Sequence, residues 1–385
     1  MANSLLAVPS VDVNAASNEG WTPLHSAAST GRGEVVNMLL NHRKVPNLLL
    51  AVLHADINDA GNPLLDVMTV NVNATDNLGR TPFYLAVSRG HFNVVKLLLA
   101  VPQTDVNAAA NSGLLAQHEA VVGGATHIVT ALLAVACPLL AVSRIDVNAV
   151  DINGRTMLHF VAMEGKLDLA QHLLAVPGID VHGADSRGRT PLHYAAAHGQ
   201  LRVMNLLLLA HDIDVNAADN DRMTVLHSAV ASSGNCGAAN PLLAVVQALL
   251  QTPNISVNTR DITGRTPLHW AVMYAKVDVI KALFQVQNVD ANIAASPLLA
   301  VSSIDVNAVA NPLLPLQSTD VNAADNEGRT ALHCVASSGH RNVVETLLGR
   351  VDIDLNATTN GGETALDIAW RCDHTEIASI LRGRS

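Results

Sequence analysis

Apolar residues recur in short helical patterns that repeat along the chain. Asp151, Asp185 and Asp219 begin successive copies of one pattern, and they lie 34 residues apart. In the copy at Asp185, Leu192 and Leu207 belong to two separate sets of apolar positions with i, i+3, i+4 spacing, each typical of one face of a helix. The pattern therefore predicts two short helices in each repeat.

The residues between the apolar sets explain where each helix begins and ends. Gly188 suits a tight turn because glycine adopts positive φ easily. Thr190 can cap the next helix, and Pro191 follows at the first helical position, where a missing N–H costs little. Gly199 ends that helix. Two short helices cannot bury their apolar faces alone, so the repeats must stack into a solenoid.

The signature around this turn is found along nearly the whole chain. A T-P-L-H motif starts at Thr22, Thr190 and Thr266, and a D-V-N-A loop separates many of the units. This pattern resembles the ankyrin repeat. The resemblance implies an all-α repeat solenoid, an ankyrin-repeat stack of helix pairs with β-hairpin fingers. It also implies a concave face that is used for protein recognition.

We interpret residues 1–385 as a single solenoid of about nine units, one of them degenerate at 111–150. The spacing between units indicates loop insertions near 43–72, 136–142, 236–243 and 291–324. These share an N-P-L-L-like fragment and look like partial duplications, although a docking loop remains an alternative. The insertions at 43–72 and 291–324 could divide the stack into blocks that melt independently.

The two ends of the sequence differ in character. The segment L-L-A-V-P-S-V-D-V-N-A-A at Leu5 is similar to the end of a second helix, so the N-terminus begins mid-repeat. We therefore expect that the chain could be a fragment of a longer protein. Near the C-terminus, Asp367 replaces the motif histidine, and the charged residues Arg371, Glu376 and Arg382 are typical of a solvated capping repeat.

Composition and charge restrict the classes of partner. Hydrophobic residues make up 49% of the chain and aromatic residues 3%, which favours close-packed small helices. The net charge of −10 argues against nucleic acid as a partner, because phosphate binding needs a positive surface. No segment is long and apolar enough for membrane insertion, and no signal peptide is evident. The four cysteines form no C-x-x-C pair, which favours a reducing, cytoplasmic location.

Histidine is abundant, but its placement does not indicate a metal site. Among the 17 histidines, one set occupies a single repeat position: His25, His159, His193, His227, His269 and His333. Residues one repeat apart form a row rather than a cluster around an ion. His42, His54, His118 and His211 have no companions at ligand spacing. No nucleophile or phosphate-binding motif is present. We predict no catalytic residues, no cofactor, no metal and no small-molecule substrate.

Arginine recurs directly after the turn glycine of several repeats. The residues are Arg80, Arg155, Arg189, Arg265 and Arg329. Stacking would place them in a ladder along the finger tips. One hypothesis is a basic stripe that grips an acidic partner peptide. The alternative is that each arginine pairs with an aspartate of a neighbouring finger, such as Asp151 or Asp185.

A second set of candidate binding residues lies on the first helices. Phe160, Tyr194 and Trp270 share the position after the motif histidine, which favours packing between repeats. The resemblance implies that residues three to four positions later face the concave groove. These are Met163, Glu164, His198, Met273 and Tyr274, and such side chains suit partner anchors. Tyr274 precedes Ala275, where the helix-ending glycine is lost, so this repeat is our main candidate for a binding hot spot.

The D-V-N-A loops carry a possible modification. Each of five asparagines follows a leucine by eight residues: Asn107, Asn148, Asn216, Asn307 and Asn322. The resemblance implies that such asparagines can be substrates of an asparaginyl hydroxylase. The alternative is that the repeat period alone fixes the spacing and that the asparagines shape the loop.

Two functions are consistent with this sequence. The first is a protein–protein interaction scaffold or adaptor that binds a partner protein on its concave face without catalysis. The second is a regulatory or targeting ankyrin arm of a larger enzyme or channel. The partner is a protein whose identity the sequence does not give, because fold alone does not specify function.

Overall fold

The computed structural model describes residues 12–41, 70–135, 145–232, 241–285 and 319–384. Most of the predicted insertions lie outside the described residues, as does Asn307. The described parts of those insertions belong to elements of the neighbouring repeats. Pro241 begins a helix, and residues 319–324 belong to the loop before the next repeat.

The chain divides into two compact units, Met1–Ser186 and Arg187–Ser385. The helices of the first unit are α2 (Pro23–Ser29), α3 (Gly33–Asn41), α5 (Pro82–Ser88), α6 (Phe92–Leu99), α7 (Ala116–Val122), α8 (Thr126–Val135), α9 (Met157–Glu164) and α10 (Leu167–Leu174). Those of the second are α11 (Pro191–Ala197), α12 (Leu201–Leu208), α13 (Val225–Ala231), α14 (Pro241–Leu250), α15 (Pro267–Met273), α16 (Val277–Phe284), α17 (Ala331–Ser338), α18 (Arg341–Leu347), α19 (Ala365–Arg371) and α20 (Thr375–Arg382).

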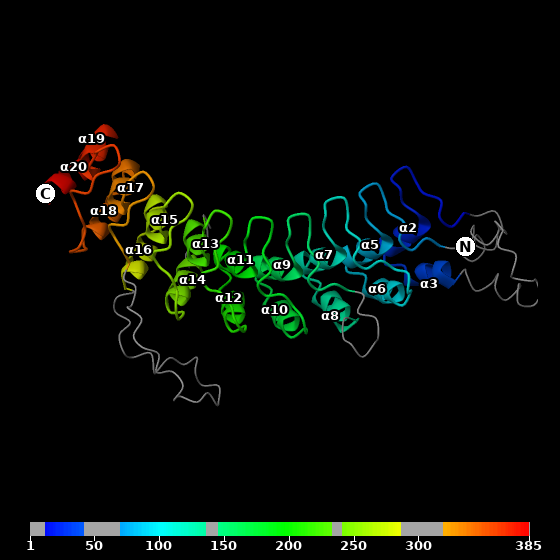
Figure 1. Cartoon of the computed structure of the whole chain (residues 1–385). Helices are drawn as coiled ribbons and strands as arrows, with labels where there is room; N and C mark the ends of the chain where they lie inside the picture. The colour runs from blue at the N-terminus through cyan, green and yellow to red at the C-terminus, as the bar shows by residue number, and fades with distance from the viewer. Residues whose placement is uncertain (1–11, 42–69, 136–144, 233–240, 286–318, 385) are drawn as a thin grey trace, which may run out of the picture. The chain divides into compact units, whose positions relative to one another are not determined.

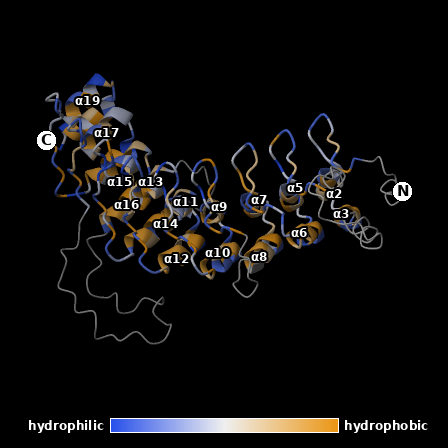
Figure 2. Cartoon of the chain, turned by 45° about the vertical axis from the view of Figure 1, so that its right-hand side comes forward, coloured by the Kyte–Doolittle hydropathy of each residue, from blue (hydrophilic) through white to orange (hydrophobic). Residues whose placement is uncertain are grey.

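Within each unit the helices form two rows. In the first unit, α2, α5, α7 and α9 make a row of first helices, and α3, α6, α8 and α10 make a row of second helices (Figure 1). Loops project from the row of first helices, and they are more polar than the helices (Figure 2). Each unit is therefore a stack of helix pairs, as the repeat pattern predicts.

The apolar stripes of the two helices meet in the core of each repeat. Leu192 of α11 is 1% exposed, and Val203 and Leu207 of α12 are 1% and 0% exposed. Burying one such side chain contributes roughly 2 kcal/mol to folding. The apolar faces predicted from the sequence are confirmed at these positions.

Six of the first helices in the described part of the chain begin at a cap built from the repeated threonine and histidine. In α2 the Thr22 backbone N–H donates to His25 Nδ1 at 3.1 Å, and the Thr22 hydroxyl lies 2.8 Å from the same nitrogen. Pro23 follows at the start of the helix and has no N–H to satisfy. The same threonine–histidine cap begins α9, α11, α13, α15 and α17.

The other ring nitrogen of the histidine joins one repeat to the next. His25 Nε2 lies 3.0 Å from the carbonyl oxygen of Arg80, and His227 Nε2 lies 3.1 Å from that of Arg265. Because Nδ1 accepts a backbone N–H, the neutral ring carries its proton on Nε2 and donates it to this carbonyl. Equivalent bonds start from His118, His193, His269 and His333.

The structure adds His118 to the histidine row. In the degenerate repeat its Nδ1 accepts the Leu115 N–H at 3.4 Å, and its Nε2 lies 3.2 Å from the Ala149 carbonyl oxygen. The sequence motif does not reveal this role, because Leu115 and Gln117 replace the usual threonine and leucine. The histidine has kept its position although the residues around it have changed.

The tight loop before each first helix, such as Asp261–Arg265, is called a finger below. The predicted β-hairpins are reduced to isolated bridges in the described residues: Ala109 with Leu115, Ala218 with Thr224, and Thr358 with Thr364. A finger is too short for a ladder of strand pairs. It closes instead through bonds such as Gly79 N–H to the Asp76 carbonyl at 2.8 Å.

Successive fingers within a unit are joined by a ladder that sequence analysis does not predict. The Asn77 N–H donates to the Glu19 carbonyl at 3.1 Å, and Asn77 Nδ2 donates to the Asn18 carbonyl at 2.9 Å. Asn111, Asn326 and Asn360 make the same pair of bonds to the finger before them. The fingers are thus held side by side by backbone and asparagine groups.

None of the helices in the described part of the chain combines the length and the apolar character that crossing a membrane requires.

Prediction for the histidine row. Burial lowers the pKa of His118 to about 4, and it lowers the pKa values of His193, His227 and His269 from the usual 6.5. The unfolded chain therefore takes up protons first as the pH falls below 6.5, so stability present at neutral pH is lost on acidification. We expect the free energy of unfolding to fall between about pH 7.5 and 5.5, by about 1 kcal/mol for each histidine that stays neutral in the fold.

Chemical denaturation at the two pH values measures this effect, and His118→Gln is the matched control. The variant removes one titrating ring, so its unfolding free energy should fall by about 1 kcal/mol less over the same interval. Equal pH dependence in the two proteins would contradict the assignment of His118 to the row.

Candidate functional site

The candidate site is the first-helix face of the second unit, which we define by the exposed side chains of the fingers and of α11, α13 and α15. The fingers place an arginine or its replacement at the edge of this face. The first helices then present the residue after the motif histidine and the residues one turn later. The chemistry of the face follows from how these positions are filled.

The finger arginines are held by aspartates. Arg80 Nη2 lies 2.7 Å from Asp76 Oδ2, and Arg155 Nη2 lies 2.7 Å from Asp151 Oδ2. Burial alone would raise the pKa of Asp76, but hydrogen bonds from the Arg80 side chain and from backbone N–H groups outweigh burial and hold this pKa below its usual value. These arginines complete the fingers rather than presenting unpaired charge.

The pairing hypothesis needs a correction in its geometry. Arg329 Nη2 lies 3.0 Å from Asp325 Oδ2, so the partner, as for Arg80 and Arg155, belongs to the same finger and not to a neighbouring one. An aspartate four residues before the arginine faces it across the tight turn, which explains this choice. Arg265 does reach the next finger, with Nε 3.8 Å from Asp325 Oδ2.

Aromatic rings lie beneath several of these arginines. The Arg189 guanidinium is 4.7 Å from the centre of the Tyr194 ring, and Arg189 Nη2 donates to the Tyr194 hydroxyl at 2.8 Å. Tyr194 in turn stacks on His198, with ring centres 6.3 Å apart. The result is a column of arginine, aromatic ring and second ring on α11.

A similar column stands on α15. The Arg265 guanidinium lies 6.0 Å from the centre of the Trp270 ring, and Trp270 stacks on Tyr274 at 5.8 Å. The Trp270 Nε1–H donates to Asp261 Oδ2 at 2.9 Å, which fixes the indole. Cation–π contacts of this kind contribute about 0.5–1 kcal/mol each at exposed sites.

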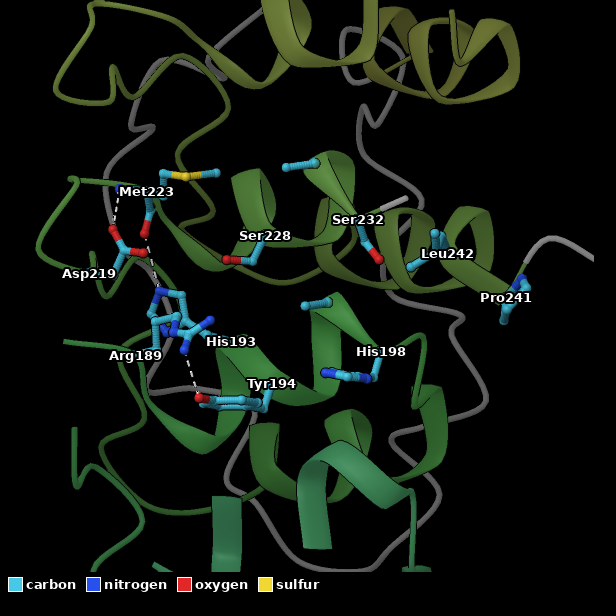
Figure 3. Close-up of a pocket in the computed structure, with 12 residues that line it drawn as sticks. Arg189, His193, Tyr194, His198, Asp219, Met223, Ser228, Ser232, Pro241 and Leu242 are labelled. Atoms are coloured by element: carbon cyan, nitrogen blue, oxygen red, sulfur yellow. Dashed lines mark hydrogen bonds between the residues drawn. The ribbon is translucent and has the colours of Figure 1, made fainter. Parts of the chain in front are cut away.

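The repeat between the two columns carries small side chains. Met223 fills the arginine position of its finger. Ser228 of α13 and Ser232, which directly follows α13, fill the two ring positions. A groove with a volume of about 530 Å³ opens there. It is lined on one side by the α11 column and on the other by Asp219, Met223, Ser228 and Ser232, with Pro241 and Leu242 at one end (Figure 3).

The predicted anchors of α15 are accessible. The side chains of Met273 and Tyr274 are 37% and 45% exposed. Lys276 reaches back to the end of α13, where its Nζ donates to the carbonyl oxygens of Val230 and Ser232. Burial lowers the pKa of this ammonium group. Lys276 therefore ties α13 to α15 beside the two exposed anchors.

The remaining predicted anchors divide between the units. His198 directly follows α11, is exposed and lines the groove. Glu164 is exposed and Met163 half-buried at the end of α9, in the first unit. Phe160 is 4% exposed and stacks on His118 of the previous repeat at 5.0 Å, as the predicted packing role requires. The groove therefore brings together residues of the second unit alone.

The loop asparagines use both ends of their amides. Asn148 Nδ2 donates to the Gly178 carbonyl at 2.8 Å, and its Oδ1 accepts the Asp180 N–H at 2.9 Å. Asn216 and Asn322 repeat this bridge to the following loop, and Asn107 Oδ1 accepts the Asp146 N–H. These bonds support the loop-forming role; hydroxylation stays a prediction.

Side chains with metal-binding or nucleophilic chemistry do not gather in the described part of the chain. There, no three His, Cys, Asp or Glu residues lie close enough to hold a metal ion. Burial raises the pKa of the Cys334 thiol to about 11, which suppresses its nucleophilic thiolate form. Cys372 is also a free thiol, and Cys137 and Cys236 lie outside the described residues.

Part of the groove is formed by residues that the repeat motif does not single out. None of Asp219, Met223, Ser228 and Ser232 stands out as a binding residue in the sequence, and Ser232 resembles an ordinary turn residue. The sequence indicates the groove only through a missing residue: at position 223 a methionine stands where most other fingers have an arginine. The significance of that replacement depends on what the arginine contacts in the other fingers.

Comparisons with known proteins agree with the repeat architecture. A family model described as ankyrin repeats in three copies matches residues 48–138, 134–219, 162–245, 211–295 and 298–384. A second model, described as ankyrin repeats in many copies, matches residues 1–40. Together the matches extend along almost the whole chain.

Individual relatives match smaller parts. Neurogenic locus notch homolog protein 1 of Mus musculus and that of Homo sapiens are each 29% identical over 186 residues, which cover 42% of this chain and 7% of the relative. Leucine-rich repeat serine/threonine-protein kinase 1 of Caenorhabditis elegans is 36% identical over 86 residues, which cover 22% of this chain and 3% of the kinase. The matched part is thus a small fraction of each relative.

Prediction for the end of α15. Ala275 has φ 53°, in the left-handed region where an alanine is strained by roughly 1 kcal/mol or more. We expect Ala275→Gly to raise the free energy of unfolding by about 1 kcal/mol, measured by chemical denaturation.

The matched control makes the reverse change at the equivalent position two repeats earlier. Gly199 follows α11 with φ 70°, and an added Cβ would lie 3.2 Å from Pro241 Cβ. Gly199→Ala should therefore lower the unfolding free energy by at least as much. A neutral or destabilising effect of Ala275→Gly would show that the left-handed conformation at this position is not strained.

Proposed function

The chain belongs to the ankyrin-repeat family, and on this premise we propose that it is a protein-interaction scaffold or adaptor that holds a partner protein on the first-helix face of its second unit. Ankyrin repeats generally mediate protein–protein interaction, and the family is typically non-catalytic. The proposal assigns no catalytic step, cofactor or small-molecule substrate to the chain.

One observation carries the proposal: the groove beside α13 and the exposed anchors of α15 lie in consecutive repeats. The groove measures about 530 Å³, and Met273 and Tyr274 are 37% and 45% exposed beside it along the stack. Energetically dominant contacts in interfaces come from aromatic and other large side chains that fit pockets on the partner. A groove followed by such anchors is suited to an extended or helical segment of a partner.

A second candidate is a targeting or regulatory ankyrin arm of a larger protein. It is favoured by the relatives, since the matched region is 7% of the notch homologues and 3% of the kinase. The same face would bind the partner in both cases. The candidates differ in whether the effect of binding is exerted on another domain.

We also propose a reducing, cytoplasmic location. The support is the spacing of the four cysteines, which forms no C-x-x-C pair, and the free thiols of Cys334 and Cys372.

Prediction for the binding face. We expect a partner protein captured from cell lysate by the wild type to be lost by the triple variant His198→Ala, Met273→Ala, Tyr274→Ala, because these exposed side chains anchor it. Affinity capture read by mass spectrometry measures the loss. Thermal melting must first show that the variant is as stable as the wild type.

The control places the same number of substitutions on the second helices: Arg202→Ala, Asn205→Ala and Lys281→Ala, all at exposed positions of α12 and α16. This variant should retain the partner. Retention by both variants, or loss by the second-helix variant alone, would remove the first-helix face as the site.

A further inference from the structure

The aspartate that opens a finger uses its two carboxylate oxygens differently. In the finger of Asp325, Oδ1 accepts the backbone N–H groups of Glu327 and Arg329 at 2.9 Å each. Oδ2 accepts Arg329 Nε at 3.0 Å. Asp76 and Asp151 repeat this arrangement with the arginine four residues later. One oxygen therefore shapes the turn, and the other neutralises its charge against a cation.

A different donor serves the same oxygen in the finger before α15. Asp261 Oδ1 accepts the N–H groups of Thr263 and Arg265, and Oδ2 accepts Trp270 Nε1 at 2.9 Å. The donor has changed from a guanidinium to an indole, but Oδ2 is still satisfied. Asp261 is accordingly 3% exposed, and Asp76 and Asp325 are 6% exposed.

Asp219 departs from this rule. Its Oδ1 accepts the N–H groups of Asp221 at 3.0 Å and of Met223 at 2.8 Å, as in the other fingers. The residue four positions later is Met223, whose side chain has no N–H group or charge to offer Oδ2. Within the described residues, no side chain donates to Asp219 Oδ2 and no cation forms an ion pair with it.

The vacated position is open to solvent and to a ligand. Asp219 is half-buried and lines the groove beside Met223, Ser228 and Ser232. Ser228 stands where α15 has Trp270, so no large ring covers the carboxylate from the helix (Figure 3). The space that an arginine and an aromatic ring fill in other repeats is part of the groove here.

None of the basic side chains that line the groove hydrogen-bonds or ion-pairs with Asp219 in the part of the chain that the structure describes. Burial lowers the pKa values of His193 and His227, so both rings are neutral at pH 7. The Arg189 guanidinium stacks on Tyr194 at 4.7 Å and donates to its hydroxyl at 2.8 Å. His198 stacks on the same Tyr194 ring and is exposed.

We propose that the groove beside α13 binds a basic side chain of the partner protein, an arginine in an apolar segment, and that Asp219 Oδ2 accepts its guanidinium in the place that a finger arginine fills in other repeats. This inference rests on the proposed protein-binding function and adds the chemistry of the partner. The chain supplies the acceptor, and the partner supplies the donor that Met223 cannot.

The lining of the groove suits arginine. A guanidinium is planar and carries five N–H donors, so one or two of them can bind Asp219 Oδ2 while the others stay available for hydroxyl groups that line the groove. The Met223 thioether can adapt to the apolar stem of the side chain. Leu242 extends the apolar lining for the neighbouring residues of the partner.

The experiment uses a phage-displayed library of short random peptides as the probe, selected on the full-length chain. We expect the recovered binders to share an arginine among apolar residues. Replacing that arginine by its neutral isostere citrulline should weaken binding by about tenfold or more, because the charge-assisted bond to Asp219 is lost. Fluorescence anisotropy with the labelled peptide measures the affinity.

Met223→Arg is the decisive variant. It restores the finger arginine within the chain, so it should satisfy Asp219 and fill the site. We expect this protein to melt at a higher temperature than the wild type and to bind the peptide at least about tenfold more weakly. Unfolding cannot explain a loss of binding that accompanies a gain in stability.

Met223→Leu is the matched control, since it changes the side chain without adding charge, and it should keep the affinity within about threefold. Asp219→Asn should lose the preference for arginine over citrulline. Recovery of acidic peptides, or equal binding of arginine and citrulline peptides, would overturn the basic partner while leaving the scaffold function in place. Selection of no peptide that requires the first-helix face would count against both.

Discussion

The stack depends on a neutral histidine that is bound at both ring nitrogens by the backbone. Nδ1 accepts the N–H of the capping threonine, as between Thr22 and His25 at 3.1 Å. Nε2 faces the carbonyl of the next finger, as between His25 and Arg80 at 3.0 Å. A protonated ring would turn Nδ1 into a donor facing another donor, so the geometry itself favours the neutral form. One side chain thus caps a helix and hydrogen-bonds its repeat to the next one.

In two repeats another residue replaces the histidine, and these repeats show that the helix cap and the bond between repeats can be made separately. Tyr84 takes the position in α5; its N–H donates to Thr81 Oγ1, and its hydroxyl crosses to Glu119 Oε1 at 3.1 Å. Asp367 takes it in α19 and accepts from both the N–H and the hydroxyl of Thr364, at 2.9 and 2.6 Å. The aspartate performs the cap alone. The cap is therefore the local requirement, and the bond between repeats can be made by other groups.

Much of the fold follows from the sequence because the period repeats the same local solution. Thr190, Pro191 and Leu192 predict a capped helix from local sequence alone. In the structure Thr190 caps α11, Pro191 begins it and Leu192 is buried. The contacts within and between fingers could not be predicted, because the sequence does not tell whether an arginine binds the aspartate of its own finger or that of the next finger. Arg329 pairs with Asp325 of its own finger, whereas Arg265 reaches Asp325 of the next finger. The role of His118 was hidden for a similar reason, since its neighbours had lost the motif.

The groove illustrates why the site is harder to predict than the fold. Residues that match the repeat satisfy one another: Arg155 with Asp151, Trp270 with Asp261. A surface built only from such pairs has few polar groups left to bind a partner, and these groups are the same in every repeat. Distinctive recognition must then come from positions where the pattern breaks, such as Met223 opposite Asp219. The replacement of an arginine by Met223 can be seen in the sequence. That this replacement leaves Asp219 without its donor becomes clear only from the structure of the other repeats, where an arginine or a tryptophan binds the equivalent aspartate.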